Sequence, residues 1–433
     1  MIVLLIGYMW IFIHRPFEIW HSLRIITSER IYILVCAVLW LFFHKKSTIR
    51  NINIHAIISI TVAILISDYM TNTTELMNGT VEEWLKILFF LILLITSVRS
   101  EMELKVILTS FSVIFFVYML HSYYEFKFCG RVVYSMGIPR LCGIGATLND
   151  PNSFGASIVY YLPVLVPLWM LVRGVPAIPI RLFCIGSFCL SVICISDTGS
   201  RGSFIGLISY VILAAAFSKN RWKILTVAVV VFPILWASMD QRIQDRYLTI
   251  IDPSRQSASA KASTEGRIGG FKWGMALFQN SPIYGVGPGK SADYIPSGLQ
   301  THNFLGQVAG ELGGIGLVTY GFLCFCITIN YLFSRFYWKI LSKHCPNADS
   351  YPFQVSQAVF IAMILLLILG LGSHNAYRYT WVWYAVFQSM AVVALKKKTE
   401  DVISEQIKSN MTASTPAHVQ EQIDSDIPVP QPV

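Results

Sequence analysis

The sequence predicts an all-α integral membrane protein, and two observations lead to this fold class. Hydrophobic residues make up 55% of the 433 residues and charged residues only 13%, whereas soluble domains carry about 25% charged residues. The hydrophobic residues also occur in blocks, separated by short loops that hold most of the charge. Helices suit such blocks because a helix satisfies its own backbone hydrogen bonds within the hydrocarbon layer.

About twelve blocks are candidate membrane-spanning helices, compared with the roughly 20 apolar residues that cross a bilayer. They are centred on residues 2–13, 31–43, 54–67, 84–98, 104–121, 154–172, 180–196, 203–217, 222–238, 303–332, 353–371 and 379–395. The first block would cover only about 20 Å of a hydrocarbon core of about 30 Å. It therefore either continues past Pro16 or lies partly in the interface.

Basic residues in alternate loops predict the orientation, because cytoplasmic loops are enriched in Lys and Arg. One set of loops is basic, around residues 45–50, 99–105, 173–181, 219–223, 335–343 and 396–398, whereas residues 68–83 carry acidic residues and no Lys or Arg. Both termini are then cytoplasmic. These loops explain the net charge of +9, so we do not expect a nucleic-acid partner.

The same reasoning divides the chain into four parts. Residues 1–238 are expected to form nine membrane helices, and residues 303–395 three more. Between them, residues 239–302 form one long outer loop, in which we expect short amphipathic helices. Residues 396–433 are polar and are expected to be a disordered cytoplasmic tail.

Some basic residues are predicted on the outer face, where they are unusual. The long loop holds seven basic and five acidic residues, but long loops are translocated regardless of charge. Arg201 is more informative because it lies in a short outer loop, where basic residues are disfavoured. Arg140 and Arg378 are expected on the same face.

The short loop around Arg201 has the composition of a phosphate site. Ser200 can cap the helix that follows, and the free N–H groups and dipole at a helix start favour an anion. Gly199 and Gly202 leave room beside the arginine. The alternative is an interfacial arginine whose side chain simply reaches water.

A second segment, within the long loop, predicts an amphipathic helix that Ser263 or Thr264 can cap. Arg267 shares a face of this helix with Gly270 and Gly274, which would let a bulky ligand approach the backbone. An ordinary interfacial helix would explain the apolar stripe of the segment but not its glycines. The stripe consists of Ile268, Phe271, Met275 and Phe278.

A third segment, Ser281–Gly289, is rich in turn residues and leads toward His302 at the start of the next helix. The helix dipole should lower the pKa of His302 and keep its imidazole neutral, which suits a general base. The alternative is an ordinary histidine near a helix cap. Upstream, Asn149 or Asp150 can cap a helix that has Pro151 in its first turn.

Six short motifs follow one another in order: Arg140…Asp150-Pro151-Asn152, Ser200-Arg201-Gly202, Gly266-Arg267…Trp273, Pro282…Gly285-Val286-Gly287-Pro288-Gly289, His302-Asn303 and Glu311-x-Gly313-Gly314-x-Gly316. This order, with the long loop before His302, resembles the O-antigen ligase and polymerase superfamily over about residues 130–330. The N-terminal Trp10…His14-Arg15-Pro16 also resembles ligase-like members linked to exosortase-type systems.

The resemblance implies an enzyme of the bacterial inner membrane with a periplasmic active site. It would transfer a glycan from a polyprenyl-pyrophosphate carrier to a lipid, protein or sugar acceptor, with inversion and without a metal or other cofactor. Arg201 and Arg267 would hold the pyrophosphate, and His302 would activate the acceptor hydroxyl. The substrate-binding residues would be Arg140, Asp150, Asn152, Lys272 and Asn303.

Several alternatives stay open. Ligases and polymerases share these motifs, although the long loop favours a ligase. A transporter would place ionisable groups near the bilayer midplane, whereas here they lie at the outer boundary. A metal-dependent transferase would need an acidic pair in an outer loop, but Asp424-Ser425-Asp426 falls in the predicted tail. A disulfide between Cys129 and Cys142, which share an outer segment, is a further hypothesis.

Overall fold

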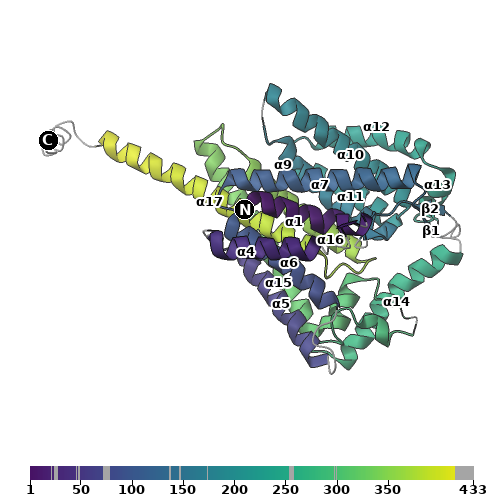
Figure 1. Ribbon diagram of the computed structural model, residues 1–433. Helices are drawn as coiled ribbons and strands as arrows, with labels where there is room; N and C mark the ends of the chain where they lie inside the picture. Colours follow the sequence, from purple (N-terminus) through teal and green to yellow (C-terminus); the bar gives the residue numbers. More distant parts are fainter. Residues whose placement is uncertain are drawn as a thin grey trace.

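The computed structural model describes residues 1–20, 22–23, 28–44, 46, 49–71, 79–135, 138–145, 148–172, 174–252, 258–296, 298 and 300–414. These residues form a helical bundle with one small β-hairpin at its edge (Figure 1). The α-helices are α1 (Ile2–His14), α2 (Pro16–Ile19), α4 (Ser28–Phe43), α5 (Ile52–Thr71), α6 (Gly79–Ser97), α7 (Glu101–Phe128), α8 (Pro151–Tyr161), α9 (Leu165–Trp169), α10 (Ile178–Thr198), α11 (Arg201–Phe217), α12 (Arg221–Ser238), α13 (Gln241–Leu248), α14 (Ala258–Asn280), α15 (Phe304–His344), α16 (Tyr351–Gly370) and α17 (Tyr379–Ser414). Three 3₁₀ turns, η2 (Leu162–Val164), η3 (Val175–Ala177) and η5 (Ser291–Tyr294), and the antiparallel strands β1 (Val133–Ser135) and β2 (Ile138–Arg140) complete the described elements.

Every hydrophobic block predicted from the sequence falls on helical structure. The block at residues 154–172 is divided into α8, η2 and α9, because Pro163 and Pro167 each lack a backbone donor. The first block does not continue past Pro16 as one helix, because Arg15 adopts a left-handed conformation with φ 51° and ends α1.

Among the described residues, six helical segments are long and apolar enough to cross a membrane: Ile52–Thr71, Glu101–Phe128, Val175–Thr198, Arg221–Ser238, Phe304–His344 and Tyr351–Gly370. α1 and α11 are also apolar but shorter. The protein is therefore an all-α membrane protein of the multi-pass type.

The centre of the bundle is the first half of α17, which packs against α5, α6, α7, α15 and α16. Its Trp381 and Trp383 are almost completely buried. In the same helix Gln388 donates to the carbonyl of Ile327 on α15 at 3.0 Å and accepts from Asn53 of α5 at 3.0 Å. Aromatic packing and these buried hydrogen bonds fix the position of α15, whose first turn follows directly on the loop that contains His302.

The long helix α15 is broken at Gly313, and the turn-rich loop before it fills the break. Gly313 has φ 64° and is non-helical. The N–H of Gly314 donates to the carbonyl of Pro282 at 2.8 Å, while the N–H of Gly287 donates to the carbonyl of Glu311 at 3.0 Å. Such bonds satisfy irregular backbone at membrane depth, which is tolerated only where protein surrounds it. This pairing accounts for two of the six sequence motifs as structural features.

The carboxylate of Glu311 lies inside the same break and is fully buried. Its two oxygens accept from the N–H of Gly289 at 2.9 Å and from the hydroxyl of Ser291 at 2.6 Å. Charge-assisted bonds of this kind compensate the desolvation of a carboxylate. Glu311 therefore links the segment of Gly289 and Ser291 to α15.

Helix α14 packs directly along the first turns of α15 through glycines on both helices. A side chain at Gly270 would meet the backbone N of His302 at 2.8 Å, and one at Gly306 would meet the carbonyl oxygen of Gly270 at 2.9 Å. The glycines at 270 and 274 were predicted to admit a ligand, and that prediction is wrong because the α15 backbone occupies the space. The apolar stripe of α14 faces outward instead, with Ile268 and Phe271 exposed.

Replacing Gly274 by alanine is expected to destabilise the protein, because the new methyl group would clash with the backbone of Gly306. Overpacking of this kind costs about 1–3 kcal/mol. Gly269 is the matched control, since it lies on the same helix and has open space where its side chain would be; alanine there should be neutral or stabilising, by up to about 1 kcal/mol. Thermal unfolding of both variants in detergent measures the difference, and equal melting temperatures would refute the close contact between α14 and α15.

Three further expectations from the sequence differ from the structure. Residues 396–414, expected to begin a disordered tail, continue α17 as helix, and Lys398 forms an ion pair with Glu101 of α7 at 3.5 Å; residues 415–433, with the Asp-Ser-Asp sequence, lie outside the described residues. The predicted cap at residues 263–264 lies within α14, which begins at Ala258. Cys129 and Cys142 are both free, Cys129 at the exposed end of α7 and Cys142 buried beside Asn149, so the hypothesised disulfide is not formed.

Candidate functional site

Arg201 is the first residue of α11 and is positioned by the helix cap. α10 ends at Gly199, whose φ of 54° turns the chain sharply. Ser200 then caps α11, as predicted, by accepting from the N–H of Ser203 at 3.3 Å. The Arg201 side chain is buried, and its Nη1 donates to the hydroxyl of Thr249 just after α13 at 3.2 Å. The arginine is therefore held in place rather than extended into water.

Arg140 on strand β2 is buried beside the end of α10. Its Nε donates to the carbonyl of Thr198 at 2.7 Å and its Nη2 to the side-chain oxygen of Asn152 at 2.9 Å. Asp150 caps α8, as predicted, by accepting from the N–H of Ser153 at 2.8 Å. Asn152 therefore positions Arg140, while the Asp150 carboxylate acts on its neighbours through its charge.

Arg246 on α13 is a site residue that sequence reasoning missed. Its Nε donates to the carbonyl of Gly199, next to Arg201. The short amphipathic helix that carries it packs against α11, where the ring of Tyr247 stacks on Phe204 at a centroid distance of 4.2 Å. The apolar residues Ile243 and Tyr247, four positions apart, could have indicated the short helix. They could not have singled out Arg246, because a basic residue in a long loop is not unusual.

Arg267 on α14 lies half-buried against the loop between α16 and α17. A side chain on Gly372 would meet the Nε of Arg267 at 3.5 Å, so this glycine leaves the space that the guanidinium occupies. Burial and then Arg201 lower the pKa of Arg267, while the charge of Asp150 raises it. Arg267 therefore approaches the same region as Arg201, although the two come from different helices.

His302 lies one residue before the cap of α15 and is paired with a second histidine. Its Nδ1 is 3.1 Å from the Nδ1 of His374, in the loop between α16 and α17. The pKa of His302 is lowered, as predicted, but the main cause is burial, followed by opposing effects of Asp150, which raises it, and Arg267, which lowers it. Burial and the charges of His302 and Arg378 lower the pKa of His374 to about 4.

Arg140, Arg201 and Arg246 lie together at the turn between α10 and α11, because Arg140 donates to the carbonyl of Thr198 and Arg246 to that of Gly199. The pKa of Arg246 falls to about 10, first through burial and then through Arg140, Arg201 and Arg267. Burial also lowers the pKa of Arg140, and the charge of Arg267 acts in the same direction. Repulsion between buried cations is relieved by an anion with several oxygens, such as a phosphate or pyrophosphate.

The cluster of Arg140, Arg201, Arg246 and Arg267, with Asp150, His302 and His374, is called the arginine–histidine site here. Two other predicted residues do not join it. Asn303 has a structural role. Its side-chain oxygen caps α15 by accepting from the N–H of Gly306 at 2.9 Å, and its side-chain NH₂ donates to the carbonyl of Leu371 at 2.9 Å. Lys272 is exposed on α14. The site can bind a polyanion and offers a neutral imidazole beside it.

Comparison with known protein families matches residues 186–321 to the family described as O-antigen ligase. The matched range contains Arg201, Arg246, Arg267 and His302, but it ends before His374. A search of curated proteins found no match.

Proposed function

We propose that the protein transfers a glycan from a polyprenyl-pyrophosphate carrier to an acceptor hydroxyl, because residues 186–321 match the O-antigen ligase family. The observation that carries the proposal is the clustering of Arg140, Arg201 and Arg246 at the α10–α11 turn, with Arg267 acting electrostatically on both Arg201 and His302. A superfamily of lipid-linked glycan transferases and a site built for a polyanion next to a base support the same reaction.

The proposed reaction is an inverting displacement at the anomeric carbon. The acceptor oxygen forms a bond to that carbon, the bond from the carbon to the pyrophosphate oxygen breaks, and the electron pair leaves with the carrier pyrophosphate. Arg201 and Arg267 stabilise the leaving group with paired N–H donors. His302 takes the hydroxyl proton, and the scheme routes no step through a metal.

The histidine pair suits the role of a base. When the proton of His302 lies on Nδ1, it is donated to the Nδ1 of His374, and the Nε2 of His302 keeps its lone pair for the acceptor hydroxyl. His374 can accept because its lowered pKa keeps it neutral. His374 would thus be a positioning residue that selects the tautomer of His302.

The proposed topology has about twelve spanning segments, with both termini cytoplasmic and the arginine–histidine site periplasmic, in a bacterial inner membrane. The support is the alternation of basic loops in the sequence, which predicts that the start of α11 lies on the less basic face. Ligase activity is favoured over polymerase activity by the long loop at residues 239–302.

The test uses purified protein in nanodiscs with a polyprenyl-pyrophosphate oligosaccharide, a set of lipid, protein and sugar acceptors, and no added metal. Release of polyprenyl pyrophosphate and the size of the glycan product are followed together. Release that depends on His302 supports the transferase, with one capped acceptor indicating a ligase and a ladder of products indicating a polymerase. Movement of intact donor across the membrane without release would instead support a transporter.

The pH dependence of transfer provides a separate test of the site. His302 is active as a base when neutral, so activity should fall as the pH drops through its lowered pKa. Asp150 raises that pKa, so Asp150→Asn should move the acidic limb of kcat/KM to lower pH while still capping α8. Asp240→Asn, the same change at the exposed cap of α13, should leave the limb in place. A shift to higher pH in Asp150→Asn would contradict the assignment of the base.

A further inference from the structure

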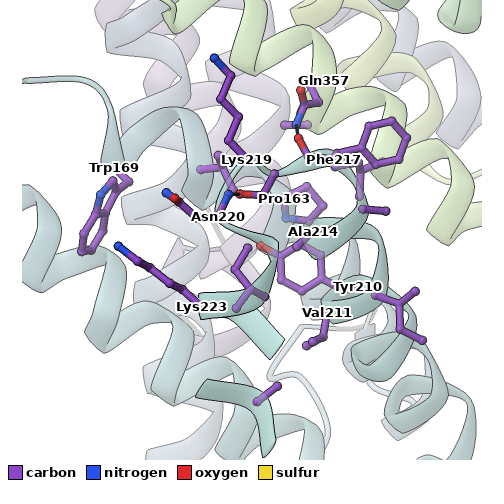
Figure 2. A pocket seen from close by; sticks show the side chains of 18 of the residues that line it. Pro163, Trp169, Tyr210, Val211, Ala214, Phe217, Lys219, Asn220, Lys223 and Gln357 are labelled. Carbon is purple, nitrogen blue, oxygen red and sulfur yellow. Dashed lines mark hydrogen bonds between the residues drawn. The ribbon is translucent and has the colours of Figure 1, made fainter. Parts of the chain in front are cut away.

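The helix α12 stands apart from the rest of the bundle. None of its residues is buried, whereas each of the other five candidate spans buries at least 39% of its apolar window. α12 packs along α11, and a cavity of about 1760 Å³ is lined by residues of α11, α12, α15 and α16 (Figure 2). Small-molecule sites are about 300–1,000 Å³, so the cavity is of a size for a larger and longer ligand.

The cavity is apolar along most of its lining and basic in one region. Figure 2 shows Val211, Ala214 and Phe217 of α11 among the apolar side chains. Lys219 and Lys223, at the turn from α11 to α12, also line it. Arg335 and Lys339, near the end of α15, add two more cations, and none of the described lining residues is acidic. Within the described part of the chain, none of these four cations forms a salt bridge.

We propose that this cavity binds an anionic phospholipid, with its acyl chains between α11, α12, α15 and α16 and its headgroup on Lys219, Lys223, Arg335 and Lys339. The four cations lie in segments predicted to face the cytoplasm, where the leaflet is anionic and basic pockets between membrane helices bind acidic headgroups. From Leu207 to Phe217, α11 lines the cavity over about 16 Å, which is close to the depth of one leaflet in a hydrocarbon core of about 30 Å.

The donor carrier fits this cavity less well than a phospholipid. Arg201 and Phe217 are the two ends of α11, about 25 Å apart along a helix of this length. A pyrophosphate bound at the arginine–histidine site therefore cannot also contact Lys219 and Lys223. The headgroup bound at the basic region belongs to a different lipid, and the proposal does not depend on the transferase activity.

The experiment measures which lipid the intact protein retains. Protein is reconstituted in vesicles containing equal amounts of phosphatidylglycerol and phosphatidylcholine, extracted in mild detergent, and examined by native mass spectrometry. The wild type is expected to keep phosphatidylglycerol selectively. The variant Lys219→Gln/Lys223→Gln/Arg335→Gln/Lys339→Gln should lose this adduct by about tenfold or more, as expected when several basic contacts to an acidic headgroup are removed.

Two further variants separate the cavity from surface charge. Lys46→Gln/Arg50→Gln/Lys396→Gln/Lys397→Gln removes the same number of cations from the same predicted face outside the cavity lining, and should retain the lipid. Ala214→Trp leaves every charge in place but fills the apolar part, and should displace it. Equal retention of both lipids, equal loss in both charge variants, or retention of a polyprenyl lipid in place of a phospholipid would each overturn the proposal.

Discussion

Changing Arg201 to lysine is expected to lower kcat/KM for glycan transfer by about 10²-fold or more, the scale seen when one preorganised donor to a developing anion is lost. Lysine keeps the positive charge but not the planar fork that matches two phosphate oxygens. The Arg201 side chain is already held at the hydroxyl of Thr249, whereas a lysine ammonium would have no such preset direction. Release of polyprenyl pyrophosphate by purified protein measures the loss.

Arg242 offers a matched control for this substitution. It lies on α13 as Arg246 does, but it is exposed and pairs with Asp240 at 3.2 Å. Arg242→Lys should leave turnover within about twofold of wild type, because an exposed ion pair contributes little. Turnover of Arg201→Lys at the level of Arg242→Lys, with equal amounts of folded protein in the membrane, would remove Arg201 from the site.

Changing His302 to alanine is expected to lower kcat by about 10²–10⁴-fold, the usual contribution of a positioned general base. Donor affinity should change little, because the guanidinium groups that bind the pyrophosphate remain. Single-turnover kinetics and donor-dependent thermal stabilisation separate the two effects. Normal kcat with normal protein levels would remove His302 as the base, and loss of donor stabilisation would assign it to binding instead.

His374→Leu tests the positioning role separately. It removes the acceptor for the Nδ1–H of His302 without removing the base itself, so kcat should fall by less than in His302→Ala while KM stays close to wild type. The acidic limb of the pH profile should also move, because the ring nitrogen that lies 3.1 Å from the Nδ1 of His302 is lost. A pure folding defect would instead lower the amount of active protein and leave the pH profile unchanged.

Site residues that depart from a general rule of membrane topology, or that match the residue types of helix caps, could be predicted from the sequence. Arg201 is conspicuous because positive charge is disfavoured in a short outer loop, and Ser200 and Asp150 have the residue types of helix caps. Arg246 could not be singled out, because a long loop tolerates bases at any position. His374 is a lone histidine in a short loop, and only the folded chain brings it within 3.1 Å of His302, 72 residues earlier.

The glycines show a second limit of sequence reasoning. Gly270 and Gly274 correctly indicated that something approaches α14 closely, but a missing side chain does not reveal whether a ligand or a helix fills the space. The break of α15 at Gly313 was also not predicted, because residues 303–332 are apolar enough to be taken as one span. Its hydrogen-bond partners lie in the preceding loop, so the break becomes evident only when the two segments are seen together.

The broken turn at Gly313 has a consequence for how the site can be adjusted. Backbone hydrogen bonds with the loop at residues 282–289 hold α14 and α15 together, so Arg267 and His302 belong to one structural unit. Arg201 and Arg246 belong to a second unit, formed by α11 and α13. The two arginines proposed to hold the pyrophosphate therefore come from different units, whereas the proposed base shares a unit with Arg267. Gly372 leaves the space that the Arg267 guanidinium occupies. A shift of one unit against the other would therefore change the separation of Arg201 from Arg267 but not that of Arg267 from His302.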